Sequence, residues 1–252
     1  MTDPFARFRL ATRARIGLGR SGDALPTAAL LDFQLAHARA RDAVHGAVDL
    51  GTLAASLAPV ETVAVKSAAT DRAEYLRRPD LGRRLDDADR ERLQSLPRDE
   101  RPWDIAFVIA DGLSATAVTH NGVATFAACA ERLPRDWTIA PVILAAQSRV
   151  ALGDDIAHAL GAKMVAILIG ERPGLSVAES LGIYLTLDPR PGRRESERNC
   201  ISNIHANGLS PAEAGGKLAW LAREARRIGL TGIGLKDEAP PLVEADAKTL
   251  LG

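Results

Sequence analysis

The stretch Asn199 to Gly208, NCISNIHANG, combines a thiol, a hydroxyl, amides and an imidazole within ten residues. Cys200 could act as a nucleophile if a base lay beside it, and His205 is five residues away. Spacing in sequence does not establish a catalytic pair, because such partners meet only through the fold. Nucleophilic catalysis, metal binding and contact with a cofactor are therefore the three chemistries to separate.

The imidazole of His205 has a more specific interpretation. The spacing Asn-x-His-x-x-Gly is formed by Asn203, His205 and Gly208. It differs only in its first residue from the Asp-x-His-x-x-Gly pattern of proteins that bind cobalamin through a histidine. In that pattern a carboxylate accepts the second imidazole N–H and makes the ring a better ligand, which a neutral amide does poorly. We therefore do not expect His205 to bind cobalt. Cys129 and Cys200 lie far apart and outside any CxxC pair, so the sequence predicts neither a disulfide framework nor a structural zinc site.

Alternating strand-like and helix-like segments must position this stretch. Three apolar runs, which we expect to be strands, cover residues 104–114, 137–147 and 163–170. Each is followed by a segment that we expect to be helical, at 115–133, 149–161 and 171–180. Such a succession predicts an α/β fold with a mostly parallel, Rossmann-like sheet flanked by helices. A fourth strand-like run, 182–189, leads through a charged loop into the Asn199 stretch, which we place at the rim of the sheet.

Ligands of parallel sheets bind beyond the carboxyl ends of the strands, which here indicates the loops around Asp111, 147–150 and 170–175. Each loop also has a plainer interpretation. Ser114 could simply cap the next helix, and Glu171 with Arg172 could form an exposed ion pair in a surface turn. Neither GxGxxG nor GxxxxGK[ST] is present, so hydride transfer and phosphate transfer lack their usual sequence support.

The N-terminal part of the chain differs in character. Residues 1–24 form a basic arm, 25–98 a mainly helical region with an N-terminal helical extension, and 99–252 the α/β domain. Residues 26–47 place leucines and alanines at helical spacing, which predicts a helix with a buried stripe. A β-like run at 61–67 precedes two charged helical pieces.

Composition excludes several classes of function. The 252 residues are 46% apolar, which is enough for a sizeable core, and 32 basic residues balance 32 acidic ones. This balance gives no reason to expect a nucleic-acid partner. No apolar run approaches the ~20 residues of a membrane span, and the start lacks a signal-peptide core. We expect no membrane association and a cytoplasmic location.

Several segments, in chain order, resemble the small subunit of ethanolamine ammonia-lyase. They are RIGLGRSGDALPTAALLDFQLAHARARDAVH, YLRRPDLGRRL, IADGLS, RVALGDDIAHALGAKMVAILIGERPGLSVAESLGIYLTLDPR and RNCISNIHANGLSPAEA. The resemblance runs from about Arg15 to Lys236, and GERPGL and CISNIH are its most specific parts.

The resemblance implies a carbon–nitrogen lyase that uses adenosylcobalamin to convert ethanolamine to acetaldehyde and ammonia by a radical mechanism. In this family a large TIM-barrel subunit holds ethanolamine and most catalytic groups, and the small subunit covers the cobalamin from the other side. The cofactor keeps its own dimethylbenzimidazole on cobalt. Heterodimers of the two subunits pair into a larger assembly.

Carried over by this resemblance, the cobalamin contacts of the small subunit correspond to Val150, Glu171 and Cys200, with no catalytic residue and no metal ligand in this chain. We expect Val150 to act through its backbone N–H at a helix start, and Glu171 to accept hydrogen bonds from corrin amides or a ribose hydroxyl. Cys200 is small enough to allow close packing. Four further residues are expected as neighbours: Arg149, Arg172, Ser202 and Asn203.

Two other functions stay open on the sequence. One is a cobalamin-binding companion module without lyase activity. The other is a self-sufficient α/β enzyme that uses Cys200, Asp111 or Glu171. Relatives that enter bacterial microcompartments carry a longer polar N-terminal extension, so we expect that encapsulation of this subunit would not be driven by its own tail.

Overall fold

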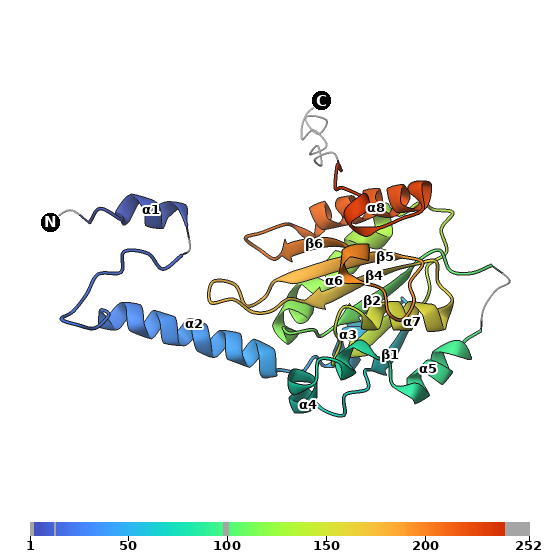
Figure 1. Cartoon of the computed structure of the whole chain (residues 1–252), viewed down its shortest axis with the longest axis horizontal. Coiled ribbons are helices and arrows are strands. Elements are labelled where there is room, and N and C mark those ends of the chain that lie inside the picture. Colours follow the sequence, from blue (N-terminus) through green and yellow to red (C-terminus); the bar gives the residue numbers. More distant parts are fainter. Residues whose placement is uncertain (1–2, 13, 98–100, 240–252) are drawn as a thin grey trace.

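A six-stranded sheet forms the centre of the molecule, with helices on both faces and an N-terminal helix that projects away from it (Figure 1). The computed structural model describes residues 3–12, 14–97 and 101–239. In spatial order the strands are β1 (Thr62–Lys66), β3 (Val142–Ala146), β2 (Ala106–Ala110), β4 (Met164–Gly170), β5 (Leu181–Leu187) and β6 (Asn199–Ile204). The first four are mutually parallel, and β5 and β6 are each antiparallel to the preceding neighbour.

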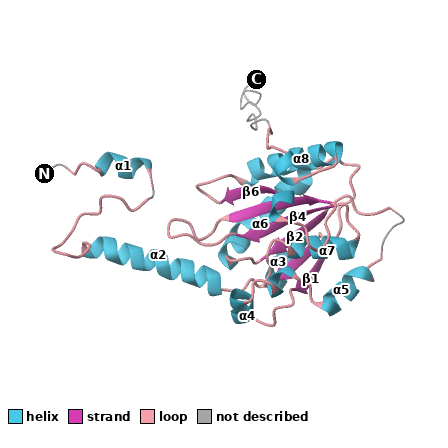
Figure 2. Ribbon diagram, in the orientation of Figure 1, coloured by secondary structure: helices cyan, strands magenta, loops and turns pink. Residues whose placement is uncertain are grey.

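More helices cover one face of the sheet than the other (Figure 2). The face that carries Phe107 and Ile183 packs against α3 (Leu50–Leu57), α6 (Ala115–Arg132) and α8 (Pro211–Ile228). The face that carries Val108 and Ile167 packs against α7 (Leu152–Leu160), with α5 (Asp87–Gln94) beside it. Both faces of the central strands are thus buried, which explains their uninterrupted apolar runs.

The α7 face is covered only in part. Helix α7 packs over β2 and β4, whereas the next strands along present Tyr184 of β5 and Cys200 of β6, which stand directly opposite each other. Tyr184 is half-buried and Cys200 is exposed. Thr186 of β5 is buried and bonds to Asp154 of α7, so the open part of this face is limited to the surroundings of Tyr184 and Cys200.

The predicted α/β class is confirmed, but the sheet is mixed because the third predicted strand-then-helix unit is wrong. Residues 171–180 form a loop that returns as an antiparallel strand instead of a crossover helix. Its backbone bonds close a hairpin: Glu171 N–H donates to Ser180 O at 2.9 Å, and Gly174 N–H to Val177 O at 2.8 Å. Pro173 has no N–H to give to a helix, which favours this outcome.

The Asn199 stretch lies at the rim of the sheet, as expected. Residues 199–204 form the edge strand β6, paired with β5. The register shifts between Leu181 and Ile183, and Asn203 adopts a φ of 66° at this irregularity. A bulge of this kind re-aims the residues that follow it.

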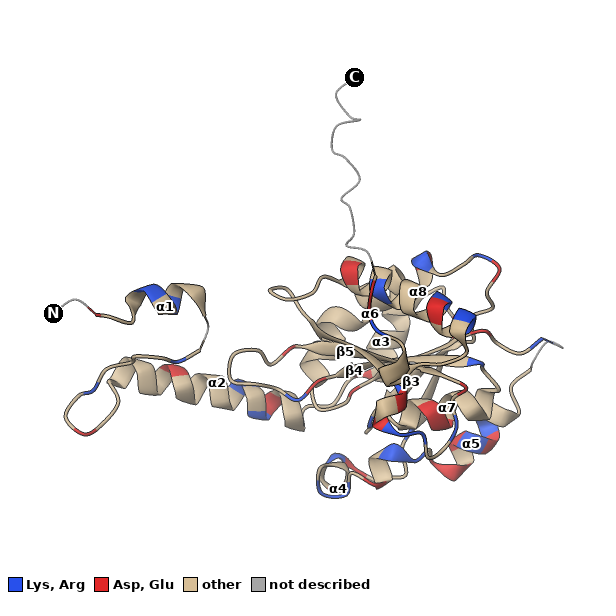
Figure 3. Cartoon of the chain, turned by 45° about the horizontal axis from the view of Figure 1, so that its top comes forward, with Lys and Arg blue, Asp and Glu red and all other residues tan. Residues whose placement is uncertain are grey.

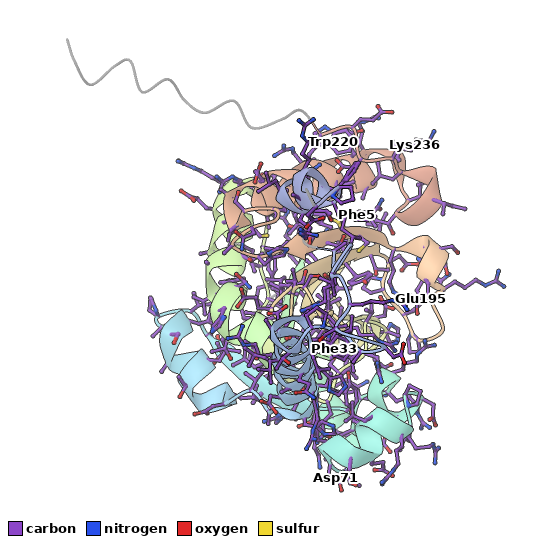
Figure 4. All side chains as sticks on the ribbon, turned by 90° about the vertical axis from the view of Figure 1, so that its left-hand side faces the viewer. Phe5, Phe33, Asp71, Glu195, Trp220 and Lys236 are labelled. Atoms are coloured by element: carbon purple, nitrogen blue, oxygen red, sulfur yellow. The ribbon has the colours of Figure 1, made fainter. Side chains whose placement is uncertain are left out.

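The N-terminal region contains α1 (Ala6–Ala11) and α2 (Thr27–His45). The predicted helix over 26–47 is confirmed, but the expected burial of its stripe is wrong: Ala43 is the one buried residue of α2, and Leu31 is 58% exposed. The reason is visible in Figure 1, where α2 extends beyond the sheet. Figure 4 looks from that side and labels Phe33 of α2 and Phe5 just before α1, which are 39% and 45% exposed.

The rest of the N-terminal region joins the sheet. Strand β1 pairs with β3 at one edge, and α4 (Arg72–Arg77) follows it. Three short 3-10 turns complete the described elements: η1 (Leu81–Arg83), η2 (Glu195–Glu197) and η3 (Gly232–Gly234). The division at residues 24 and 98 stays a prediction.

Charged residues of both signs occur along the outer helices, as Figure 3 shows for α5 and α8. In the parts of the chain that the structure describes, no helix is both long and apolar enough to cross a membrane.

Candidate cofactor-binding site

A cavity of about 220 Å³ opens at the carboxyl ends of β2, β3 and β4. The three loops singled out in the sequence meet here, through Gly112 and Leu113, residues 148–150, and residues 170–172. Val150 and Glu171 both line the cavity, as does Tyr184. Cys200 does not line it but lies beside it, opposite Tyr184 on the neighbouring strand.

Asp111 holds the first two loops together. Its buried carboxylate accepts hydrogen bonds from the backbone N–H groups of Gln147 at 2.9 Å and Ser148 at 3.0 Å. Arg72 donates to it from Nη1 at 3.0 Å. Burial raises the pKa of Asp111, and Arg72 and the two amides oppose this shift. Since its oxygens face these donors, Asp111 positions the loop that carries Arg149 and Val150.

The first and third loops are in direct backbone contact. Gly112 has a φ of 56°, and a Cβ atom there would lie 2.2 Å from Gly170 O. A Cβ atom at Gly170 would lie 2.2 Å from Ser114 O. The side chain of Ser114 accepts from Ala117 N–H at 3.1 Å, which confirms the predicted cap of α6, and donates to Ala178 O at 2.7 Å. Only glycines allow the loops to approach this closely.

Tyr75 of α4 lines the cavity and bonds to two of its loops. It is fully buried, and its hydroxyl lies 2.9 Å from Gly112 O and 2.8 Å from Ser148 O. The guanidinium groups of Arg72 and Arg149 lie over its ring, at 4.8 Å and 4.5 Å from the ring centre. Burial raises the pKa of Tyr75 to about 12, so the hydroxyl remains a neutral donor.

Val150 stands just before α7, where backbone donors lack helical partners. Arg149 N–H donates to Gly82 O at 2.8 Å, and Leu152 N–H to Arg149 O at 2.9 Å. Among the described residues, the N–H of Val150 has no acceptor. The Val150 N–H is therefore an unused backbone donor in the lining of the cavity.

Glu171 provides an acceptor on the opposite side of the cavity. Its Oε2 accepts from Ser180 Oγ at 2.5 Å and lies 3.4 Å from the Asn203 backbone N. The carboxylate also lies against Gly182, where a Cβ atom would come within 2.8 Å of Oε1. The predicted alternative of a surface ion pair with Arg172 is wrong, because Glu171 accepts from the Ser180 hydroxyl and the Asn203 backbone N–H instead.

Cys200 is poorly suited to act as a nucleophile. Although the residue is exposed, its thiol is partly desolvated where it lies against the sheet, and this raises its pKa. A hydrogen bond with the Tyr184 hydroxyl opposes the shift, and the charge of Glu171 adds to it. Burial likewise raises the pKa of Tyr184, with a further contribution from Cys200. The thiol is therefore protonated at neutral pH, whereas a nucleophilic cysteine needs a lowered pKa.

His205 is engaged in its own loop. It is buried, its Nδ1 accepts from the Asn207 N–H at 3.2 Å, and its Nε2 therefore carries the proton that it donates to Asn203 Oδ1 at 2.9 Å. A Cβ atom at Gly208 would lie 2.7 Å from Nε2. The Asn-x-His-x-x-Gly spacing thus builds a compact turn in which both ring nitrogens are bonded. Within the described residues, no group of three or more His, Cys, Asp or Glu side chains could hold a metal ion.

Sequence reasoning missed the two residues that shape this region most, Tyr75 and Tyr184. They are the only tyrosines of the chain. Tyr75 sits in a charged segment without an apolar signal, and Tyr184 reads as one more strand residue. A tyrosine within a largely aliphatic strand is the one signal that could have indicated a surface for a ligand.

Together these features define an α/β domain with a cleft at the carboxyl edge of a mixed sheet and an open sheet surface around Tyr184 and Cys200 beside it. Comparison with known proteins identifies the family. Residues 2–236 match the family described as ethanolamine ammonia-lyase light chain (EutC). The chain belongs to this family.

Curated relatives agree over almost the whole chain. An ethanolamine ammonia-lyase small subunit of Xanthomonas campestris pv. campestris is 53% identical over 249 residues, which is 97% of this chain and 92% of the relative. The corresponding protein of Bradyrhizobium diazoefficiens is 51% identical over 240 residues, 94% of this chain and 91% of the relative. That of Pseudomonas syringae pv. tomato is 49% identical over 241 residues, 94% of this chain and 84% of the relative.

Proposed function

We propose that this chain is the small subunit of an adenosylcobalamin-dependent ethanolamine ammonia-lyase, and that Val150, Glu171 and Cys200 contact the cobalamin. The observation that carries the proposal is the open part of the sheet face around Tyr184 and Cys200, next to the cleft. It offers an unused backbone donor, a carboxylate acceptor and a small neutral side chain around the ring of Tyr184. A flat, amide-rimmed corrin needs such a surface.

The chemistry of each contact follows from its surroundings. The Val150 N–H can donate to the carbonyl of a corrin amide, since nothing else in the described structure uses it. Glu171 can accept from an amide N–H or a ribose hydroxyl through the lone pairs that Ser180 leaves free. Cys200 lets the ligand approach the sheet without demanding a strong hydrogen bond.

When bound, adenosylcobalamin supplies the radical chemistry that converts ethanolamine to acetaldehyde and ammonia. The residues of this chain then have three tasks: they bind the cofactor, fix its orientation and exclude water from one side of it. The substrate and the catalytic groups belong to a large subunit, for which we propose a TIM barrel. We further propose that the heterodimers pair into a larger assembly.

A self-sufficient enzyme is disfavoured by the geometry. The thiol of Cys200 has a raised pKa, and both nitrogens of His205 are bonded elsewhere. Asp111 faces Arg72 and two backbone amides. Neither His205 nor Asp111 is available for general base catalysis in this arrangement.

The test is coexpression with a candidate large subunit, followed by measurement of ammonia release from ethanolamine with and without adenosylcobalamin. We expect activity only in the complete mixture. Ammonia release by the small subunit alone would favour the self-sufficient enzyme. Binding of cobalamin without any activity in the mixture would favour a companion module.

A further inference from the structure

A second cavity, of about 460 Å³, adjoins the proposed cobalamin site. Its polar lining consists of His37, Arg41 and His45 of α2, Arg149 before α7 and Arg172 after β4. We call this the arginine pocket. It shares Leu113, Arg149 and Arg172 with the cavity that Val150 and Glu171 line, so the two cavities are adjacent.

The arginine pocket has an unbalanced positive charge. Its lining contains three arginines and no carboxylate. Other arginines nearby are paired, for example Arg72 with Asp111 and Arg90 with Asp155. Among the described residues, none forms an ion pair with Arg41, Arg149 or Arg172. An anion that enters this space would therefore meet guanidinium groups that are not already neutralised.

Arg149 is held ready for such a ligand. Its guanidinium carbon lies 4.5 Å from the centre of the Tyr75 ring, which restricts its rotation. Its Nε is buried and has no hydrogen-bond partner. Buried polar groups are nearly always bonded in folded proteins, so an unpartnered one at a cavity indicates a missing acceptor.

Cobalamin carries one such acceptor. The side chains of the corrin are neutral amides, and the phosphodiester of its nucleotide loop is the single anionic group. The charges of the two cavities match these two kinds of group. Glu171 in the first cavity can accept from amide donors and repels an anion, whereas the arginine pocket attracts an anion. A planar guanidinium can give two parallel hydrogen bonds to phosphate oxygens.

We propose that the arginine pocket binds the phosphodiester of the cobalamin nucleotide loop, with Arg149 and Arg172 as the main donors and Arg41 closing the site from α2. This inference rests on the proposed function, because it names the part of the cofactor that lies next to the Val150 and Glu171 contacts.

The test compares two corrinoids on the assembled complex with its large subunit. Adenosylcobalamin has the nucleotide loop, and adenosylcobinamide lacks it. The variants are Arg41→Gln, Arg172→Gln and Arg149→Gln, with Arg135→Gln as a control because Arg135 is exposed and remote from both cavities. Dissociation constants are measured by equilibrium dialysis and corrinoid absorbance, so no turnover is required.

We expect Arg149→Gln and Arg172→Gln each to weaken adenosylcobalamin binding by about tenfold to a hundredfold, the usual range for a hydrogen bond to a charged group. Adenosylcobinamide binding should stay within about threefold of the wild type, and the control should change neither. Arg41 is exposed on α2, so Arg41→Gln tests the pocket with little risk to folding, and we expect a smaller selective loss.

An equal loss for both corrinoids, or no loss for either, would overturn the inference. Uptake of inorganic phosphate by the cobalamin-loaded complex, measured by calorimetry, would also overturn it, since the pocket would then serve a separate anion. Failure of the wild-type complex to bind either corrinoid would instead contradict the proposed function.

Discussion

Removal of one buried hydroxyl gives the sharpest test of how the cleft is held together. Tyr75 is fully buried, and its hydroxyl lies 2.9 Å from Gly112 O and 2.8 Å from Ser148 O. Among the described residues it is the only donor to these two carbonyls. Tyr75→Phe deletes the donor and keeps the ring between Arg72 and Arg149.

The magnitude follows from what remains buried. The single proton serves one carbonyl at a time, so its loss leaves one buried acceptor without a partner in the folded state. An unsatisfied buried acceptor costs about 1–3 kcal/mol. Against a typical free energy of unfolding of about 5–15 kcal/mol, this is measurable but does not abolish folding. Because Ser148 precedes Arg149 and Val150, cobalamin affinity should fall as well.

The chain contains its own control. Its only other tyrosine, Tyr184, is half-buried, and within the described part of the chain its hydroxyl contacts the Cys200 thiol and no backbone group. Urea unfolding of Tyr75→Phe and Tyr184→Phe, followed by tryptophan fluorescence, compares the same deletion at two sites. We expect Tyr184→Phe to cost less than about 0.5 kcal/mol. If Tyr75→Phe costs no more than Tyr184→Phe, the hydroxyl does not hold the loops and our reasoning is refuted.

Three further outcomes are expected. Asp104 is buried; burial acts to raise its pKa, but hydrogen bonds from Thr138 and Lys163 outweigh this and lower the pKa below 3.8. Since the folded-state pKa is the lower one, its stabilisation is present above pH 3.8 and lost as the pH falls through the lowered value, so Asp104→Asn should cost about 1–3 kcal/mol at pH 7 and progressively less in acid urea titrations. Cys200→Ser should keep cobalamin affinity within about threefold, whereas Cys200→Leu should lose it; a large loss for serine would mean that the thiol itself is needed. Histidine-specific nitrogen-15 labelling should leave the cobalt(II) electron paramagnetic resonance spectrum unchanged, and an altered superhyperfine splitting would make His205 a ligand after all.

The sequence alone was sufficient for the α/β class, for the strands of the sheet centre and for the loops that meet at its edge. These features are local: an apolar run of strand length between helical segments, or a serine such as Ser114 before a helix, has one dominant solution. The family resemblance was equally accessible, because long motifs such as GERPGL keep their order and spacing.

Tertiary structure decided the rest, because the rest depends on partners distant in the chain. Residues 171–180 became a hairpin loop and 199–204 an edge strand only because β4 and β5 offered antiparallel edges. The apolar spacing in α2 correctly predicts a helix. Such spacing does not guarantee that the apolar side of the helix is buried. Nothing local shows that Tyr75 reaches two loops, 37 and 73 residues away, or that three arginines from separate elements surround one cavity without a carboxylate. Hydrogen bonds and charge balance are properties of atoms in space, and spacing along the chain does not specify them.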